Sequence, residues 1–169
     1  IERADVQAAI ADLFGVPVVD GTLSAAGVKA GGVDVTKLDA KATRRGETTD
    51  FTAAASLRNG TEASVGGALA PINGGFQLSL TDLSLTQGSL AARLSEPASL
   101  VIRGQDIRID SLALDIGGGR VTASGEVADT LNLQVNVASL PLAVANAIRP
   151  DLQLAGTVDA QATVGGTRS

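Results

Sequence analysis

The feature that most constrains the fold is the alternation of apolar and polar residues that fills much of the stretch 131–166. Apolar residues occupy every second position at its start, namely Leu131, Leu133, Val135 and Val137. The pattern resumes further on with Leu152, Leu154, Gly156, Val158, Ala160, Ala162 and Val164. A period of two residues indicates β-strands with one apolar face and one solvated face.

Between these two runs the sequence predicts one short helix at about residues 140–149. Ser139 is a residue type that caps helices, and Pro141 suits a first helical turn. Pro150 would end the helix after Arg149. The apolar residues of this segment recur at helical spacing and predict a stripe that lies on the sheet: Leu140, Val144 and Ile148.

Turn signals divide the rest of the chain at intervals of about 14 residues, which predicts hairpins with unusually long arms. Asn59-Gly60 is the strongest of them, because both residue types tolerate positive φ. The others are Gly31-Gly32, Arg45-Gly46, Gly74-Gly75, Gln87-Gly88, Gly104, Gly117-Gly118-Gly119 and Asp129.

Several of these arms change phase halfway, near Thr36, Thr81 and Ser111. One extra residue within a strand is what a β-bulge supplies, and bulges bend and twist the strand. Bulges in several strands would fold a sheet while one face stays apolar. The predicted fold class is therefore all-β, with one long, curved, mainly antiparallel sheet bent into a U-shaped groove.

The alternation also predicts which side chains line the groove. They are the bulky aliphatic and aromatic residues at inward positions of the later arms: Phe76, Leu78, Leu80, Leu83, Leu85, Leu100, Ile102, Ile107, Ile109, Leu112, Leu114, Ile116, Val121, Leu131, Leu133, Val135, Val137, Leu152 and Leu154. The earlier arms are rich in Ala. The groove is therefore expected to differ in width between its two ends.

Residues 1–15 are expected to form an amphipathic helix, ended by Gly15 and Pro17, that caps the sheet. Residues 16–169 are expected to form the continuous curved sheet. We interpret the chain as an internal fragment of a larger protein.

Composition argues against several functional classes. The net charge is −5, with acidic and basic residues interspersed, which does not favour nucleic acid as a partner. The chain contains no His and no Cys, so zinc sites, disulfides and the common nucleophile–base pairs are excluded. Strand alternation points Asp106, Asp110 and Asp115 toward solvent. No catalytic residue, metal site or cofactor is predicted, and an enzyme is the least favoured class.

The apolar face itself poses the functional question. Two short helices cannot cover a sheet of this width, so the face must pack on itself, meet another copy or bind something apolar. A structural or adhesin-like β-domain with a closed, self-packed core is one alternative. A transmembrane β-barrel is a weaker one, because three Phe cannot form aromatic girdles.

Several segments resemble one known family. They are Glu96-Pro97-Ala98, the turn Gly117-Gly118-Gly119-Arg120 leading to Gly125, the run Leu140-Pro141-Leu142, and Pro150 followed by Leu152, Leu154 and Gly156. Over roughly residues 75–166 the chain resembles the TamB family of bacterial envelope proteins, which is related to the AsmA-like and bridge-like lipid transfer proteins.

The resemblance implies a protein that crosses the periplasm and is anchored in the inner membrane of a Gram-negative bacterium. It further implies that an apolar groove carries phospholipid acyl chains, or strands of outer-membrane proteins, between the two membranes. Implied partners are an outer-membrane insertase of the TamA type, reached through regions outside this chain, and neighbouring repeats of the same chain. No catalytic residues follow from the family.

Overall fold

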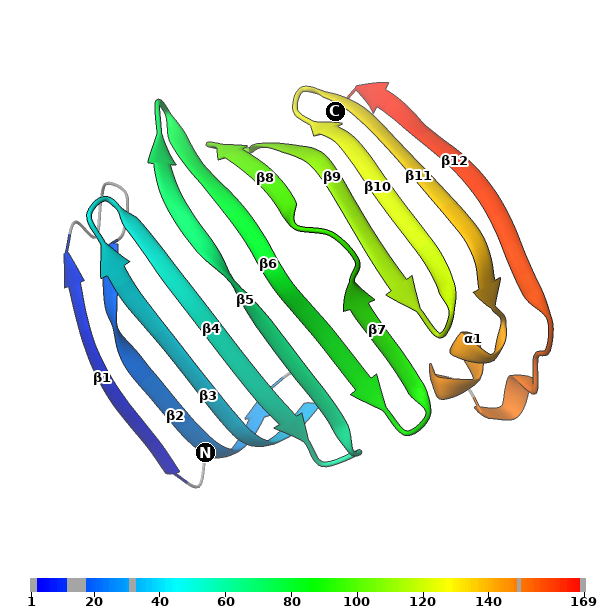
Figure 1. The fold of residues 1–169 in the computed structure, drawn as a ribbon, viewed down its shortest axis with the longest axis horizontal. Helices are drawn as coiled ribbons and strands as arrows, with labels where there is room; N and C mark the ends of the chain where they lie inside the picture. Colours follow the sequence, from blue (N-terminus) through cyan, green and yellow to red (C-terminus); the bar gives the residue numbers. More distant parts are fainter. Residues whose placement is uncertain (1–2, 12–17, 31–32, 149, 168–169) are drawn as a thin grey trace.

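The protein is described by a computed structural model that covers residues 3–11, 18–30, 33–148 and 150–167. It consists of one antiparallel sheet (Figure 1). The strands are β1 (Arg3–Ala11), β2 (Val18–Ala30), β3 (Val33–Arg45), β4 (Thr48–Leu57), β5 (Thr61–Ile72), β6 (Gly75–Gln87), β7 (Leu90–Leu94), β8 (Ala98–Arg103), β9 (Asp106–Ile116), β10 (Gly119–Val127), β11 (Thr130–Pro141) and β12 (Thr157–Thr167). The prediction of an all-β fold with one large sheet is confirmed.

Neighbours in the sequence are neighbours in the sheet, apart from one interrupted position. β7 and β8 both lie between β6 and β9, and together they fill the place of one strand. The interruption falls at Ser95–Pro97, where Ser95 N donates a hydrogen bond of 2.9 Å to Ala113 O. Pro97 has no amide proton to give to a ladder, so a break at this position is expected.

The predicted helix at the start of the chain is wrong over the residues that the structure describes there. Residues 3–11 form the edge strand β1, whose register on β2 runs from Arg3 opposite Ala26 to Ala11 opposite Val18. The remaining predicted helical positions, with Gly15 and Pro17, lie outside the described residues.

The turns between strands lie where Gly and Asn predicted them in the described part of the chain. In the hairpin between β4 and β5, Gly60 adopts a φ of 81° and its amide donates to Leu57 O at 3.0 Å. The Thr61 amide donates to Asn59 Oδ1 at 3.1 Å. The side chain of Asn59 thus caps the turn, and Gly60 supplies the left-handed residue that the turn requires.

The three predicted phase slips are breaks in strand register. Thr36 is the extra residue between Val35 and Lys37 in the pairing of β3 with β4. Thr81 is the extra residue opposite the Gly66–Gly67 step of β5. Ser111 lies at the irregularity that β9 makes with both β8 and β10.

A fourth irregularity, which the sequence did not reveal, lies between Val137 and Leu140 in the pairing of β11 with β12. Ser139 adopts a φ of 50° there. Its amide donates to Asp159 Oδ1 at 2.8 Å. The predicted role of Ser139 as a helix cap is therefore wrong, because Ser139 lies within β11.

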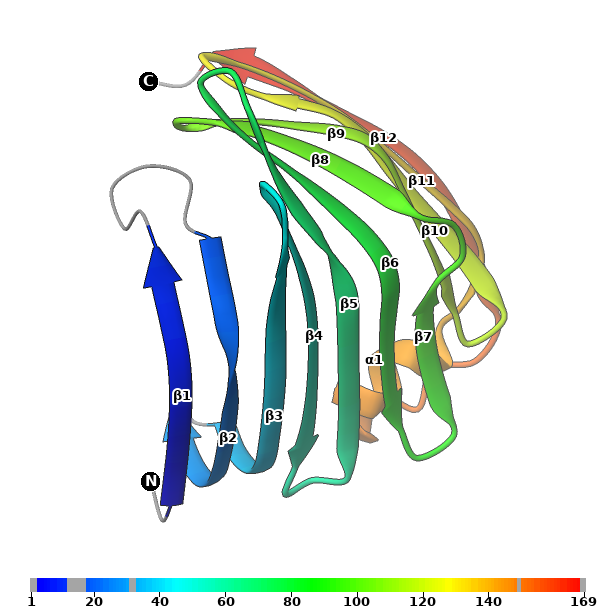
Figure 2. The same ribbon diagram turned by 60° about the vertical axis from the view of Figure 1, so that its left-hand side comes forward.

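Figure 2 shows the result of these irregularities: the strands bend over along their length, and the sheet acquires a concave and a convex side. Bulges increase local twist and bend the strand that carries them, which accounts for the curvature.

One short α-helix, α1 (Ala143–Ile148), follows β11 as predicted, and a single 3-10 turn, η1 (Pro150–Leu152), succeeds it. Asn146 of α1 stabilises the segment between α1 and β12 through two hydrogen bonds. Its Nδ2 donates to Leu154 O and its Oδ1 accepts from Leu154 N, both at 2.9 Å. The chain then enters β12.

Candidate apolar binding face

Apolar side chains from β6 to β11 form rows across one face of the sheet. Residues paired across antiparallel strands share a face, so the register identifies each row directly. One row runs through Phe76, Ile102, Ile107, Val127 and Leu131. A second runs through Leu78, Leu100, Ile109, Gly125, Leu133 and Val164.

The rows continue beyond the bulges on the same face. One contains Leu112, Ala123, Val135 and Ala162, and the next contains Leu94, Leu114, Val121, Val137 and Ala160. Ile109 and Leu112 of β9 are three positions apart, yet they pair with Gly125 and Ala123 of β10, which are only two positions apart. The extra residue in β9 thus keeps both of its side chains on the same face. The bulge therefore keeps the apolar pattern in phase while the strand bends.

Seventeen of the nineteen residues predicted for the groove occupy this face, from Phe76 to Val137. The other two do not. Leu152 ends η1, and Leu154 lies in the connection before β12, with exposed fractions of 45% and 37%. The physical reason is the register: Pro141, the last residue of β11, already pairs with Thr157, so residues 152–156 have no strand to pair with.

The half of the face on β2 to β5 is lined mainly by small side chains. Its rows include Gly21, Ala42, Phe51 and Gly67, and Ala25, Leu38, Ala55 and Ala63. The β2 members, such as Leu23 opposite Ala40, were not among the predicted inward residues. Their signal was present in the alternation of Gly21, Leu23 and Ala25.

Phe51 is the one large ring in this half of the face. Its Cζ lies 3.1 Å from the position where a Cβ on Gly67 would stand. The ring therefore covers the glycine of the neighbouring strand and fills space that no side chain of β5 occupies.

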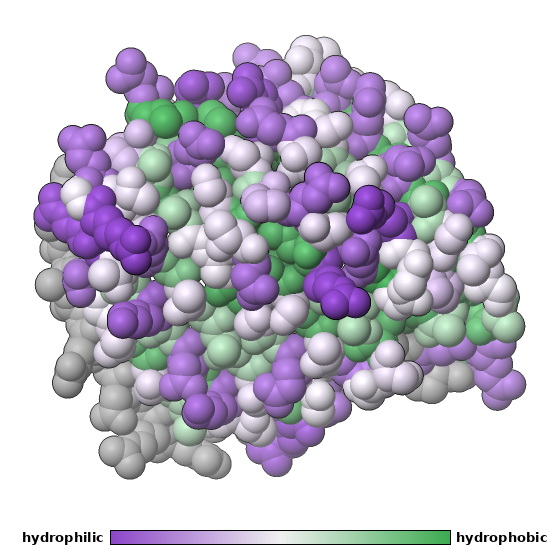
Figure 3. All heavy atoms as spheres, in the orientation of Figure 1, coloured by the Kyte–Doolittle hydropathy of each residue, from purple (hydrophilic) through white to green (hydrophobic). Residues whose placement is uncertain are grey.

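The apolar face lies on the concave side of the sheet. Figure 3, drawn in the orientation of Figure 1, shows hydrophilic and neutral side chains with apolar areas between them on the face turned to the viewer, and Figure 2 shows that this is the convex side. The rows of aliphatic side chains are on the other side.

Nothing in the described part of the chain forms a second layer over the concave face. The protein exposes 10626 Å² of surface, whereas a compact monomer of 16.8 kDa is expected to expose about 7,600 Å². Among the described hydrophobic residues, only Ala98 and Val101 are buried, and Val101 pairs with Gln77 and Arg108 on the convex side. The face is therefore open and not a sealed core.

The helix α1 lies at one end of this open face. A Cβ on Gly117, in the turn between β9 and β10, would stand 3.4 Å from Leu90 Cδ1 and 3.6 Å from Val144 Cγ2. Val144 of α1 and Leu90 of β7 thus meet beside this turn. The helix closes part of the end of the face and leaves the length of the strands uncovered.

The convex face is polar and carries several ion pairs. Arg108 contacts Asp110 at 3.0 Å and Arg120 contacts Asp115 at 3.1 Å, with all four side chains solvent-exposed. The predicted solvated positions of these two carboxylates are confirmed. Within the described residues no group of three acidic side chains converges in a way that could hold a metal ion.

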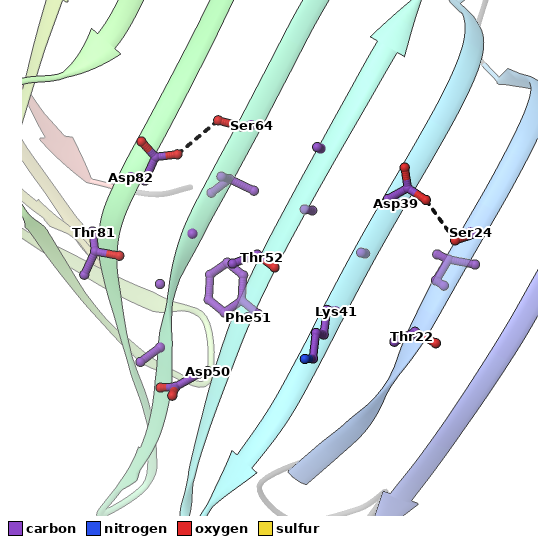
Figure 4. A pocket seen from close by; sticks show the side chains of 18 residues that line it. Thr22, Ser24, Asp39, Lys41, Asp50, Phe51, Thr52, Ser64, Thr81 and Asp82 are labelled. Carbon is purple, nitrogen blue, oxygen red and sulfur yellow. Dashed lines mark hydrogen bonds between the residues drawn. The ribbon is translucent and has the colours of Figure 1, made fainter.

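A shallow hollow lies on the convex face over β2 to β6 (Figure 4). The small residues Ala54, Gly66 and Ala68 form its floor. Two pairs of its polar groups bond to each other, since Ser24 donates to Asp39 at 2.8 Å and Ser64 donates to Asp82 at 3.0 Å. The hollow exists because these small side chains leave space between the larger polar side chains around them.

Titration of this convex surface gives a testable expectation. A hydrogen bond from Lys37, followed by one from Ser24, lowers the pKa of Asp39 below its ordinary value, and the same contact of 2.7 Å raises the pKa of Lys37. The contribution of Asp39 to stability is present above the ordinary Asp pKa of about 4 and is lost as pH falls through the folded value. That of Lys37 is present below about pH 10.4 and is lost as pH rises through its folded value.

Because the chain has no His and both partners are solvent-exposed, we expect a broad, flat stability optimum between these limits. Urea unfolding measured from pH 3 to pH 11 would check it. Asp39→Asn should flatten the acid limb slightly, and a steep change of stability near neutral pH would contradict the expectation.

Comparison with known proteins finds no matching family model, no significantly similar curated protein and no significantly similar solved structure. The resemblance to the TamB family thus rests on the sequence motifs. In the described residues, no helix is both long and apolar enough to span a membrane.

Proposed function

We propose that this chain is a non-enzymatic segment of a periplasm-spanning bacterial envelope protein, and that its concave face binds phospholipid acyl chains in transit between two membranes. The observation that carries the proposal is the open face, with its rows of mostly aliphatic side chains. Exposed apolar surfaces of this extent are characteristic of binding sites for apolar partners.

The chemistry of the lining supports acyl chains over a compact ligand. Leu, Ile and Val dominate the rows on β6 to β11, and polar side chains are confined to the ends and to the convex side. A specific small-molecule site normally includes a few convergent polar groups that fix orientation. Aliphatic walls without such groups suit a flexible chain that slides.

Strands of outer-membrane proteins are the second candidate cargo. The open edges of the sheet favour them, because an extended polypeptide can add to an edge by backbone hydrogen bonds. A structural β-domain is the remaining alternative, and it would require another protein layer to seal the face.

Photocrosslinking in cells tests the proposal. A photoreactive residue at Leu114 or Leu133, both on the concave face, is expected to give phospholipid adducts. The control is Asn132, the exposed neighbour of Leu133 on the convex face, which should give none.

Adducts with polypeptide alone at the inward sites would favour protein cargo or a sealing partner. Equal lipid adducts from inward and outward sites would indicate contact with a membrane surface and would contradict a groove.

A further inference from the structure

Two turns with the same Asn-Gly sequence lie at opposite ends of β5 (Figure 1). Asn59-Gly60 joins β4 to β5, and Asn73-Gly74 joins β5 to β6. All four residues are solvent-exposed, and both glycines adopt a positive φ, 81° at Gly60 and 77° at Gly74. The two dipeptides are chemically identical, so any difference in their reactivity within the folded chain must come from their surroundings.

Asparagine is a thermolabile residue, and a following glycine makes it prone to spontaneous deamidation. The backbone N of the glycine loses its proton and attacks the side-chain Cγ of the asparagine, ammonia leaves, and a succinimide ring forms. Water then opens the ring at either carbonyl and gives aspartate or isoaspartate. The reaction therefore needs a glycine amide that can lose its proton and an asparagine side chain that is free to approach it.

Hydrogen bonds restrain both reacting groups in the first turn. The amide of Gly60, which would be the nucleophile, donates to Leu57 O at 3.0 Å. The side chain of Asn59 is fixed because its Oδ1 accepts from Thr61 N at 3.1 Å. Attack would have to break both hydrogen bonds, so the fold protects Asn59.

The second turn lacks these restraints. Among the residues that the structure describes, neither the side chain of Asn73 nor the amide of Gly74 has a hydrogen-bond partner. A Cβ placed on Gly74 would meet nothing within 4 Å. The turn therefore has room for the two reacting groups to rotate toward each other.

A cation also lies against the second turn. The pairing of β6 with β8 brings the backbone of Arg103 there, since a Cβ on Gly75 would stand 3.0 Å from Arg103 Cα. Arg103 Nε donates to Asn73 O at 3.4 Å, and the guanidinium forms no ion pair within the described part of the chain. Asn73 O belongs to the same peptide group as the nitrogen of Gly74. A positive charge beside this group favours its deprotonated form, which is the nucleophile.

We propose that Asn73 is a site of spontaneous deamidation promoted by Arg103, and that Asn59 is protected. The reaction places a carboxylate beside Arg103, and isoaspartate also adds a methylene group to the backbone of the turn between β5 and β6. The modification does not depend on what the concave face binds.

Peptide mass spectrometry tests the proposal. The purified chain is incubated at pH 8 in water enriched in a heavy oxygen isotope, which labels every residue that deamidates during the incubation. Asn73 is expected to deamidate several-fold faster than Asn59 and to give both labelled aspartate and labelled isoaspartate. In the urea-unfolded chain the two sites should react at similar rates, which isolates the effect of the fold.

A charge-removing variant tests the role of Arg103. Arg103→Gln should slow deamidation of Asn73 several-fold in the folded chain and leave it unchanged in urea. Arg93→Gln, which removes an exposed arginine of β7, is the matched control and should have no effect. Circular dichroism checks that both variants stay folded. Equal rates at the two turns of the folded chain would overturn the site, and a rate at Asn73 indifferent to Arg103→Gln would overturn the role of the guanidinium.

Discussion

Gly67→Ala is expected to lower the free energy of unfolding by about 2–4 kcal/mol, whereas the same change at the adjacent Gly66 is expected to be neutral or slightly stabilising. A Cβ on Gly67 would overlap the backbone carbonyl oxygen of Ser79 and stand 3.1 Å from the Phe51 ring. The carbonyl belongs to the strand paired with β5, so it cannot move without breaking the ladder at the Thr81 bulge.

Gly66 is the matched control. A Cβ there would meet Asp82 Cβ at 3.6 Å and Thr52 Cγ2 at 3.7 Å, which are ordinary contacts. Replacing a strand glycine by alanine raises the free energy of unfolding by about 0.5–1 kcal/mol when no clash results, because alanine lowers the conformational entropy of the unfolded chain. Urea unfolding of both variants, followed by circular dichroism, measures the difference. Equal stabilities would mean that β5 and β6 do not approach each other in this way.

The bulges could be predicted because a bend leaves a trace in the sequence when one face must remain apolar. At Thr36, Thr81 and Ser111 the apolar positions shift by one residue, and register breaks occur at each. The irregularity at Ser139 left no such trace. It depends on Asp159, which lies twenty residues away in the chain and meets Ser139 only after β12 has paired.

The first strand could not be distinguished from a helix by its own sequence. Val6 and Ile10 are four residues apart, a spacing that suits one face of a helix and one face of a strand equally well. What decides the outcome is the free edge of β2, which offers nine residues of pairing. That edge is a property of the folded sheet and not of residues 3–11.

The alternation also predicted strand positions for Leu152 and Leu154, and this was wrong for a related reason: a strand needs a partner to pair with. β11 ends at Pro141 opposite Thr157, so the alternating residues before Thr157 find no ladder. For the concave face, the sequence predicted a groove but left a closed, self-packed core open as an alternative. The same aliphatic pattern is compatible with a sealed sandwich, and only the arrangement of the strands distinguishes the two.

Leu133→Asp is expected to abolish acyl-chain binding while the protein stays folded. Leu133 lies in a row with Ile109 and Leu78, at a half-buried position of the open face. In the lipid-free protein the new carboxylate can keep its water, so the loss is limited to about 1–2 kcal/mol of apolar burial. Under an acyl chain the same carboxylate would be buried without a partner.

An unpaired buried charge costs at least several kcal/mol, and about 3 kcal/mol already corresponds to a factor of about 100 in affinity. Native mass spectrometry of the chain purified from cells should show phospholipid with the wild type and with Asn132→Asp, but none with Leu133→Asp. Circular dichroism shows whether a variant that has lost its phospholipid is still folded. In a sealed core, Leu133→Asp would unfold the protein, because no water could reach the carboxylate. A folded Leu133→Asp variant that still carries lipid would place the acyl chains elsewhere on the molecule.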